Sequence, residues 1–180
     1  MEPLSVAVHA LVNIGKVRAN QTVAVFGAGM YRISLITIRI IVELSPGPVG
    51  LLLLAVAKSF GAKRVISIDI VQSRLDFAKK YAATDIYLPL KKAQDETNIA
   101  YSRRNAAEMK TKLGIDDRGD KGVDIVVDAS GAEVSIQTSI YLAKEGGWLL
   151  ANLHRFLSEL SLAGTFLQVG MGNAEVTIPM

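Results

Sequence analysis

Glycines at two separate places in the chain have the residue types and spacing of a phosphate-binding turn. Gly27 and Gly29 follow the short apolar run Thr22–Phe26, but no third glycine stands three residues after Gly29. The sequence Pro-Val-Gly at 48–50 occurs later, directly before an apolar stretch. Joined, the two pieces read Gly-Ala-Gly-Pro-Val-Gly, which permits a tight turn, close approach of the backbone to a pyrophosphate and close helix packing. We therefore interpret Gly27, Gly29 and Gly50 as parts of one divided dinucleotide-binding turn.

An acidic residue stands where such a turn needs one. Asp69 ends a second apolar run, about 20 residues after the rejoined glycines, where a carboxylate can accept hydrogen bonds from ribose hydroxyls. It favours NAD over NADP, because a 2′-phosphate about 4 Å away would cost roughly 4 kcal/mol per charge pair at an effective dielectric near 20. Arg74, one helical turn further on, has two interpretations: a residue that packs over the adenine, or a surface arginine.

Alternating strands and helices are predicted to position these residues. The apolar runs predict strands at residues 22–26, 64–70, 85–88, 123–128 and 165–169. The helix pattern covers residues 2–14, 48–60, 72–81, 102–113 and 132–143, and the last helix leads to a turn at Gly146-Gly147. Strands that are apolar on both faces and alternate with helices are typical of an α/β protein with a doubly wound parallel sheet of the Rossmann type.

Composition and charge exclude several function classes. The chain has 180 residues, of which 50% are hydrophobic, and this fits one globular domain. The net charge of +3 is spread along the chain, so we expect no nucleic-acid partner. Arg39, Glu43 and the prolines at 46 and 48 interrupt the longest apolar stretch, which excludes a membrane span there. Without a signal-peptide pattern, we expect a cytoplasmic protein.

Several of these motifs together resemble the zinc-type medium-chain alcohol and polyol dehydrogenases. The resemblance rests on Glu2-Pro-Leu-Ser-Val, the divided glycine motif, Asp69, Arg74, Asp128-Ala-Ser-Gly-Ala and Val169-Gly-Met-Gly. The stretches YAATDIYLP and VDIVVDASGAEVSIQT are similar to xylitol dehydrogenases (D-xylulose reductases) in particular.

The resemblance implies a role for each matching residue. Val49, Asp69 and Arg74 would contact NAD, and the nicotinamide side would be lined by Val169, Gly170 and Met171. Glu2 would reach the substrate or a zinc-bound water. Without the resemblance, Glu2 is better interpreted as a carboxylate favoured by the dipole of an N-terminal helix.

Zinc would be ligated outside this chain. The chain has no cysteine, and neither His9 nor His154 matches a ligand position of the family. The resemblance thus implies a small-molecule polyol substrate, an NAD cofactor, zinc in the intact enzyme, and a homo-oligomer in intact relatives.

The family pattern also marks departures in the domain organisation. Residues 1–180 would form an incomplete NAD-binding domain, without the zinc-binding catalytic domain that precedes it in the family. Segments 30–47 and 148–164 have no counterpart there, so the expected fold is a truncated Rossmann domain with two insertions. One hypothesis is that both are retained introns, because Gly29-Met30-Tyr31 can be encoded with GTATGT, a common intron start. The alternative is genuine insertions, with Leu149–Leu162 forming an extra amphipathic helix.

The expected function is hydride transfer from a secondary alcohol, such as xylitol, to NAD. Because no zinc ligands are recognised, we expect this chain by itself to be inactive. The alternative is a non-catalytic NAD-binding or interaction module. A zinc-free quinone reductase is disfavoured by Glu2-Pro-Leu and Asp69. The choice between xylitol, sorbitol and L-arabinitol is open.

Overall fold

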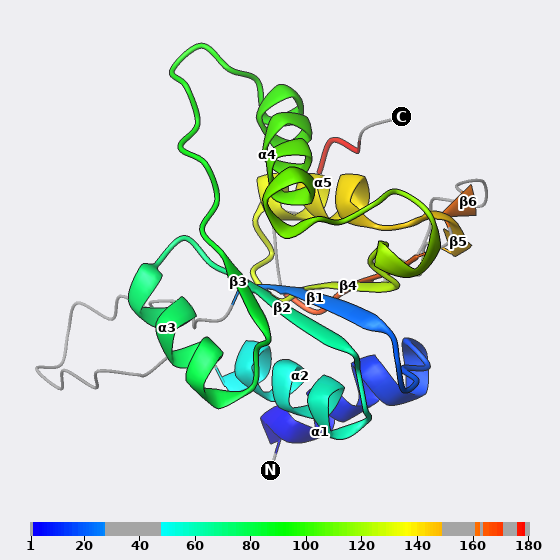
Figure 1. Cartoon of the computed structure of the whole chain (residues 1–180). Coiled ribbons are helices and arrows are strands. Elements are labelled where there is room, and N and C mark those ends of the chain that lie inside the picture. The colour runs from blue at the N-terminus through cyan, green and yellow to red at the C-terminus, as the bar shows by residue number, and fades with distance from the viewer. Residues whose placement is uncertain (1, 28–47, 149–160, 163, 171–175, 179–180) are drawn as a thin grey trace, which may run out of the picture.

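A parallel sheet of five strands forms the centre of the computed structural model, which describes residues 2–27, 48–148, 161–162, 164–170 and 176–178 (Figure 1). The strand order is β3-β2-β1-β4-β7. The strands are β1 (Thr22–Phe26), β2 (Arg64–Ile68), β3 (Asp85–Tyr87), β4 (Ile125–Asp128) and β7 (Thr165–Gln168). Phe26 at the end of β1 is in register with Ile68 of β2 on one side and with Asp128 of β4 on the other. The chain order therefore runs outward in both directions from β1, and the ends of these three strands meet at one edge.

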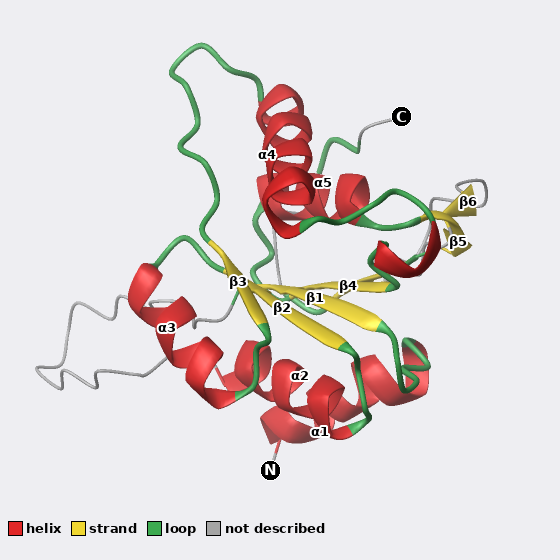
Figure 2. Ribbon diagram, in the orientation of Figure 1, coloured by secondary structure: helices red, strands yellow, loops and turns green. Residues whose placement is uncertain are grey.

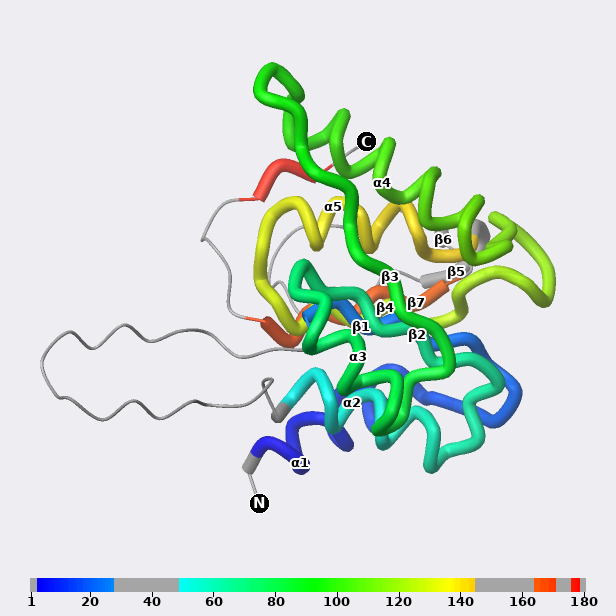
Figure 3. The backbone as a smooth tube through the Cα atoms, turned by 60° about the vertical axis from the view of Figure 1, so that its left-hand side comes forward, coloured from blue at the N-terminus to red at the C-terminus, as the bar shows by residue number. Residues whose placement is uncertain are grey.

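Helices cover both faces of this sheet, as Figure 2 shows. One face carries α1 (Glu2–Val8), α2 (Pro48–Ser59) and α3 (Gln72–Tyr81), and the other carries α4 (Asn98–Leu113) and α5 (Glu133–Leu142). The same two layers separate in the rotated view of Figure 3. The architecture is a doubly wound α/β fold, as the sequence predicts.

Alternate residues of the strands supply two separate cores. Val23 and Val25 of β1 pack into the cluster formed with α1 and α2, whereas Ala24 and Phe26 pack into the cluster formed with α4 and α5. All five residues of β1 are buried. This explains why the strand sequences are apolar without alternation.

The sequence-based boundaries of several elements differ from the structure. The second strand ends at Ile68 and not at residue 70, and the fourth strand begins at Ile125 and not at residue 123. The first helix ends as a π-helix, η1 (His9–Ile14), in which the Gly15 N–H donates to the Ala10 carbonyl at 2.8 Å. Helix α4 begins at Asn98 and not at residue 102, because the Thr97 hydroxyl oxygen caps it by accepting from the Ala100 N–H at 3.2 Å. A 3-10 turn, η2 (Gly119–Lys121), precedes β4.

The predicted turn at Gly146-Gly147 is wrong. Both glycines lie in β5 (Glu145–Trp148), which pairs antiparallel with β6 (Ser161–Leu162). A glycine pair indicates a turn only where the chain reverses, and here both residues are extended within the strand. The helix proposed for Leu149–Leu162 does not extend over its last two residues, which belong to β6. Residues 149–160 and the segment 30–47 lie outside the described part of the chain.

Candidate cofactor-binding site

The carboxyl ends of β1, β2 and β4 lie next to one another at the edge where ligands bind in open α/β sheets. Gly27 follows β1, and its N–H donates to the Ile68 carbonyl at 2.8 Å. Its φ of +87° is a left-handed conformation, and an added Cβ would lie 3.0 Å from the Ser130 nitrogen. Both the conformation and the close approach of the chain after β4 therefore require glycine at this position.

A cavity of about 290 Å³ opens at this edge. This size is at the lower end of the range of about 300–1,000 Å³ for ligand pockets and suits one nucleoside better than a whole dinucleotide. Three residues singled out in the sequence, Gly27, Asp69 and Arg74, come from three different segments and line this one cavity. The other residues of its wall are Phe26, Ile68, Ile70, Pro89, Tyr101, Asn105, Ser130, Ala132, Val134, Ser135 and Thr138.

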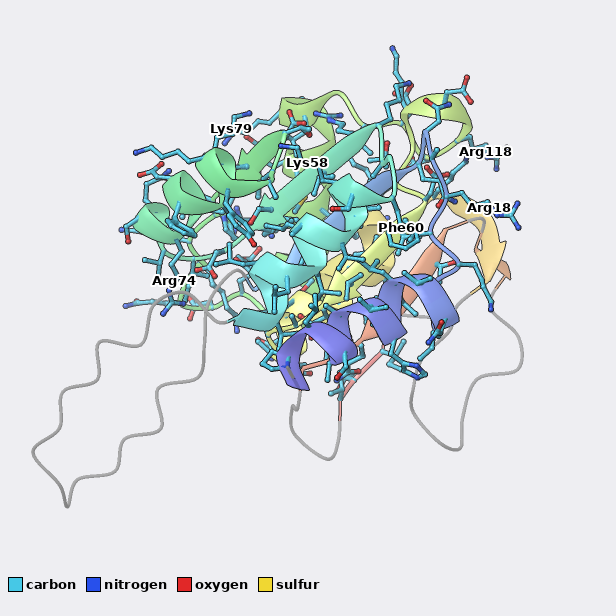
Figure 4. The ribbon with its side chains drawn as sticks, turned by 90° about the horizontal axis from the view of Figure 1, so that it is seen from below. Arg18, Lys58, Phe60, Arg74, Lys79 and Arg118 are labelled. Atoms are coloured by element: carbon cyan, nitrogen blue, oxygen red, sulfur yellow. The ribbon has the colours of Figure 1, made fainter. Side chains whose placement is uncertain are left out.

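Asp69 presents a carboxylate with unused hydrogen-bonding capacity. The residue is 6% exposed, and its Oδ1 accepts from the Val71 N–H at 2.9 Å. The same oxygen lies 3.7 Å from Nη1 of Arg74. Among the described residues, no donor is bonded to Oδ2, so that oxygen can accept a hydrogen bond from a ligand hydroxyl. Figure 4 shows Arg74 on α3, at the end of the molecule opposite Arg18 and Arg118.

Helix α4 and the connection before it form the inner wall of the cavity, which none of the sequence motifs indicates. Figure 3 shows this connection running beside α4. The Tyr101 hydroxyl donates to the Leu90 carbonyl at 2.7 Å, and burial raises the pKa of Tyr101. The Asn105 Oδ1 accepts from the Leu90 N–H at 3.0 Å and from the Tyr87 hydroxyl at 3.2 Å. The one available signal was the spacing of four residues between Tyr101 and Asn105, which places both on one helix face.

The segment after β4 is held by a buried carboxylate. Asp128 is fully buried, and its Oδ1 accepts from the Ser130 N–H at 3.2 Å and from the Ser130 hydroxyl at 2.7 Å. Its Oδ2 accepts from the Gly131 N–H at 2.8 Å. Burial raises the pKa of Asp128, and these hydrogen bonds oppose that rise. The Asp-Ala-Ser-Gly-Ala motif thus forms a loop in which Ser130 and Gly131 donate hydrogen bonds to the side chain of its first residue, Asp128.

Residues after β7 are hydrogen-bonded to the end of β4 and pack against this loop. The N–H groups of Val169 and Gly170 both donate to the Asp128 carbonyl, at 2.8 and 2.9 Å. A Cβ on Gly170 would lie 2.4 Å from the Gly131 nitrogen and 2.8 Å from the Ala129 carbonyl carbon. The two segments are therefore in backbone-to-backbone contact, which only glycine permits here.

A second, larger hollow of about 780 Å³ lies between the N-terminal helical segment and β7. Val169 lines this hollow, not the smaller cavity, together with Ser5, His9 and Asn13. Asn13 Nδ2 lies 3.1 Å from Nδ1 of His9. The structure thus separates Val169 from Gly27, Asp69 and Arg74.

Of the remaining residues singled out in the sequence, those that the structure describes do not line this cavity. Gly50 is buried in the first turn of α2, and Val49 is half-buried against the core on that face. Glu2 is the first residue of α1. Gly29 and Met171 lie outside the described residues.

Within the described ranges, no three His, Cys, Asp or Glu side chains are grouped so that they could hold a metal ion. No helix in the same part of the chain is both long and apolar enough to cross a membrane.

Comparison with known proteins identifies relatives over the whole chain. The chain is 41% identical over 180 residues to D-xylulose reductase A of Aspergillus niger, and 39% identical to D-xylulose reductase A of Aspergillus oryzae. Each alignment covers 100% of this chain and 37% of the relative, so the chain spans little more than a third of the length of these enzymes.

Solved structures share the fold at lower identity. The alcohol dehydrogenase of Thermus sp. ATN1 matches with a TM-score of 0.59 and 23% identity, over 98% of this chain and 36% of that one. The 2R,3R-butanediol dehydrogenase of Bacillus subtilis matches with a TM-score of 0.60 and 22% identity, over 99% of this chain and 36% of that one.

A family model described as zinc-binding dehydrogenase matches residues 48–151, which is more than half of the chain. The match begins at Pro48, the first residue of α2, and includes Asp69 and the loop after β4. This confirms the resemblance seen in the motifs, and the chain belongs to the zinc-binding dehydrogenase family.

Proposed function

We propose that this chain is the NAD-binding part of a polyol dehydrogenase, with xylitol as the substrate and D-xylulose as the product. The observation that carries the proposal is the convergence of Gly27, Asp69 and Arg74 on one nucleoside-sized cavity at the carboxyl ends of parallel strands. The names of the relatives support the choice of substrate.

The adenosine half of NAD is assigned to this cavity. The free Oδ2 of Asp69 would accept a hydrogen bond from a ribose hydroxyl, and Arg74 would pack over the adenine. The narrow turn at Gly27 would let the backbone approach the pyrophosphate, together with Gly29 and with Val49 and Gly50 in the first turn of α2.

The nicotinamide half is assigned to the segment after β7. Val169, Gly170 and Met171 would line it, and Gly170 is held against the loop after β4 by backbone contact. Bound NAD supplies a hydride acceptor for the alcohol carbon of the substrate. The contribution of this chain is to hold that acceptor at a fixed position at the edge of the sheet.

The zinc of the family has no fitting ligand set among the described residues. The chain has no cysteine, and the described His, Asp and Glu residues form no cluster. The proposal therefore routes no step through zinc on these residues, and Glu2 is assigned to the substrate side. In the same proposal the substrate is a free polyol in the cytoplasm, and the intact enzyme is a homo-oligomer.

Titration calorimetry with NAD and NADP tests this function. The Asp69 carboxylate would repel the 2′-phosphate of NADP, so we expect NAD to bind at least about tenfold more tightly, equivalent to about 1.4 kcal/mol. Asp69→Ala should reduce this difference. Asp76→Ala is the matched control, because Asp76 lies on α3 outside the cavity and, among the described residues, accepts a hydrogen bond from Gln72 alone. Equal or tighter binding of NADP by the unaltered chain would contradict the assignment of Asp69.

A further inference from the structure

The side-chain amide of Asn105 has a fixed orientation within α4. The residue is 2% exposed, and its Oδ1 accepts from the Leu90 N–H and from the Tyr87 hydroxyl. A backbone N–H can only donate, so the atom that faces Leu90 must be the oxygen. The nitrogen, Nδ2, is thereby directed away from Leu90.

Nδ2 has two N–H groups to donate and no acceptor among the described residues. It is not sealed inside the protein, because within the described residues Ser67 Oγ is the one fully enclosed side-chain polar atom without a partner. Asn105 lines the cavity that also contains Asp69 and Arg74. Nδ2 is therefore a donor without an acceptor among the described residues, on a side chain that lines this cavity.

Two neighbouring hydroxyl groups, those of Tyr101 and Thr138, do not supply the same chemistry. The Tyr101 hydroxyl donates its hydrogen to the Leu90 carbonyl, and the Thr138 hydroxyl donates to the Val134 carbonyl at 2.6 Å. Both oxygens can then only accept hydrogen bonds from a ligand. The Arg74 guanidinium is 30% exposed and lies beside Asp69, nearer the solvent than Asn105.

We propose that Asn105 recognises the base of the bound dinucleotide, with Nδ2 donating a hydrogen bond to a ring nitrogen of adenine. The proposal rests on the assignment of this cavity to the adenosine half of NAD. Adenine fits because its ring nitrogens are acceptors without hydrogen. A hydrogen bond to the ring would distinguish Asn105 from the apolar residues of the wall, which contact any flat base equally well.

Binding of NAD and of its 1-deaza, 3-deaza and 7-deaza adenine analogues to the full chain tests the proposal. Each analogue replaces one ring nitrogen by a C–H group. We expect one of the three to bind about fivefold more weakly than NAD, and the other two to bind like NAD. In Asn105→Ala the weak analogue should bind like NAD, because the donor is gone.

Tyr87→Phe is the matched control. It removes a second partner of the Asn105 Oδ1 but leaves Nδ2 intact, so the order of the four affinities should persist. A purely structural role of Asn105 would lower all four affinities equally in Asn105→Ala and leave their ratios unchanged, which would overturn the proposal.

The unaltered chain decides the question even when Asn105→Ala does not fold. Equal binding of NAD and all three analogues overturns the role of Asn105 and leaves the proposed function intact. Failure of the unaltered chain to bind NAD overturns both. A single weak analogue supports the proposal.

Discussion

On the β2 side of the candidate site, the Asp69 carboxylate has hydrogen-bonding capacity left for a ligand, whereas on the β4 side the Asp128 carboxylate is bonded within the protein. Among the described residues, Asp69 uses one carboxylate oxygen, which accepts a single hydrogen bond from the Val71 N–H. Asp128 uses both of its oxygens, for three hydrogen bonds to Ser130 and Gly131. Asp69 after β2 and Asp128 at the end of β4 lie on either side of β1 and thus have opposite roles: one can bind a ligand and the other holds the backbone.

Packing is also looser on the β2 side of the site than on the β4 side. Arg74 on the β2 side is 30% exposed and can change its conformation when a ligand enters. Gly170 on the β4 side has backbone atoms of Gly131 and Ala129 where a Cβ would be. A binding site needs adaptable groups that recognise the ligand and a rigid frame that holds them in register, and here the two requirements are met by different strands.

Gly170→Ala, on the rigid β4 side, should lower the free energy of unfolding more than any other substitution proposed here. The added methyl group would meet backbone atoms, which cannot move away as a flexible side chain can. We expect the free energy of unfolding to fall by about 3 kcal/mol, at the upper end of the usual cost of overpacking. Urea denaturation followed by circular dichroism measures this change.

Gly114→Ala is the control for adding a methyl group to a glycine. Gly114 ends α4 with a φ of +60°, and nothing lies within 4 Å of its added Cβ. Its cost should be about 1 kcal/mol, from backbone conformation alone. Equal costs for the two substitutions would contradict the close packing of Gly170.

Asp128→Asn should have the second-largest effect, and the size of that effect should depend on pH. The new amide nitrogen replaces an acceptor of the Ser130 or Gly131 N–H group, which costs about 2 kcal/mol. The pKa of Asp128 is raised in the folded protein, so its ionisation disfavours folding. Stability from the protonated carboxyl is complete below the ordinary pKa of 3.8 and is lost as pH rises through the raised value. The cost of the substitution should therefore shrink as pH rises.

Asp85→Asn gives the opposite trend and serves as the comparison. The guanidinium of Arg64 lowers the pKa of Asp85 through a hydrogen bond of 2.9 Å from Nε. The stabilisation by Asp85 is therefore present above the ordinary pKa and lost on acidification. Urea denaturation at a series of pH values gives the free energy of unfolding of each variant. Subtracting the value of the unaltered chain at the same pH removes the contribution of the other carboxylates. Parallel trends for the two variants would contradict the assigned environments.

Local signals predicted the β2 side better than the inner wall of the cavity. The apolar run predicts a strand over residues 64–70, and the structure ends that strand at Ile68, two residues earlier, so that Asp69 follows it at the ligand edge. Gly27 was predictable for the same reason. Asn105 was not, because its contact with Leu90 and its place beside Asp69 depend on how α4 packs across the sheet.

The errors in the fold also come from interactions that the local pattern does not contain. Gly146-Gly147 predicts a turn because glycine pairs often reverse the chain, but the pairing of β5 with β6 keeps both residues extended. The beginning of α4 differs from the prediction because the Thr97 cap determines it, and the predicted helix begins four residues after Asn98. The alternation of strands and helices was predicted correctly because apolar runs separated by glycine and polar segments recur along the chain.

Arg74→Ala should have the smallest effect on stability and the most informative effect on binding. The distance of 3.7 Å between Nη1 and the Asp69 Oδ1 and the partial exposure of Arg74 indicate a weak ion pair, so the free energy of unfolding should change by no more than about 0.5 kcal/mol. NAD affinity should fall about threefold if the guanidinium packs over the adenine. Calorimetric titration with NAD measures the change.

Arg74→Lys separates the two interpretations of this residue, because lysine keeps the positive charge but lacks the planar group that stacks on a base. A packing role predicts that Lys binds NAD as weakly as Ala. Recovery of full affinity by Lys would show that charge beside Asp69 is sufficient, and unchanged affinity in Ala would make Arg74 a surface arginine.

NADP binding gives a second measurement of the role of Arg74. Without the Arg74 cation, the repulsion between the Asp69 carboxylate and the 2′-phosphate of NADP is less well compensated. Arg74→Ala should therefore weaken NADP binding more than NAD binding, and this holds only if Asp69 and Arg74 face the same ribose.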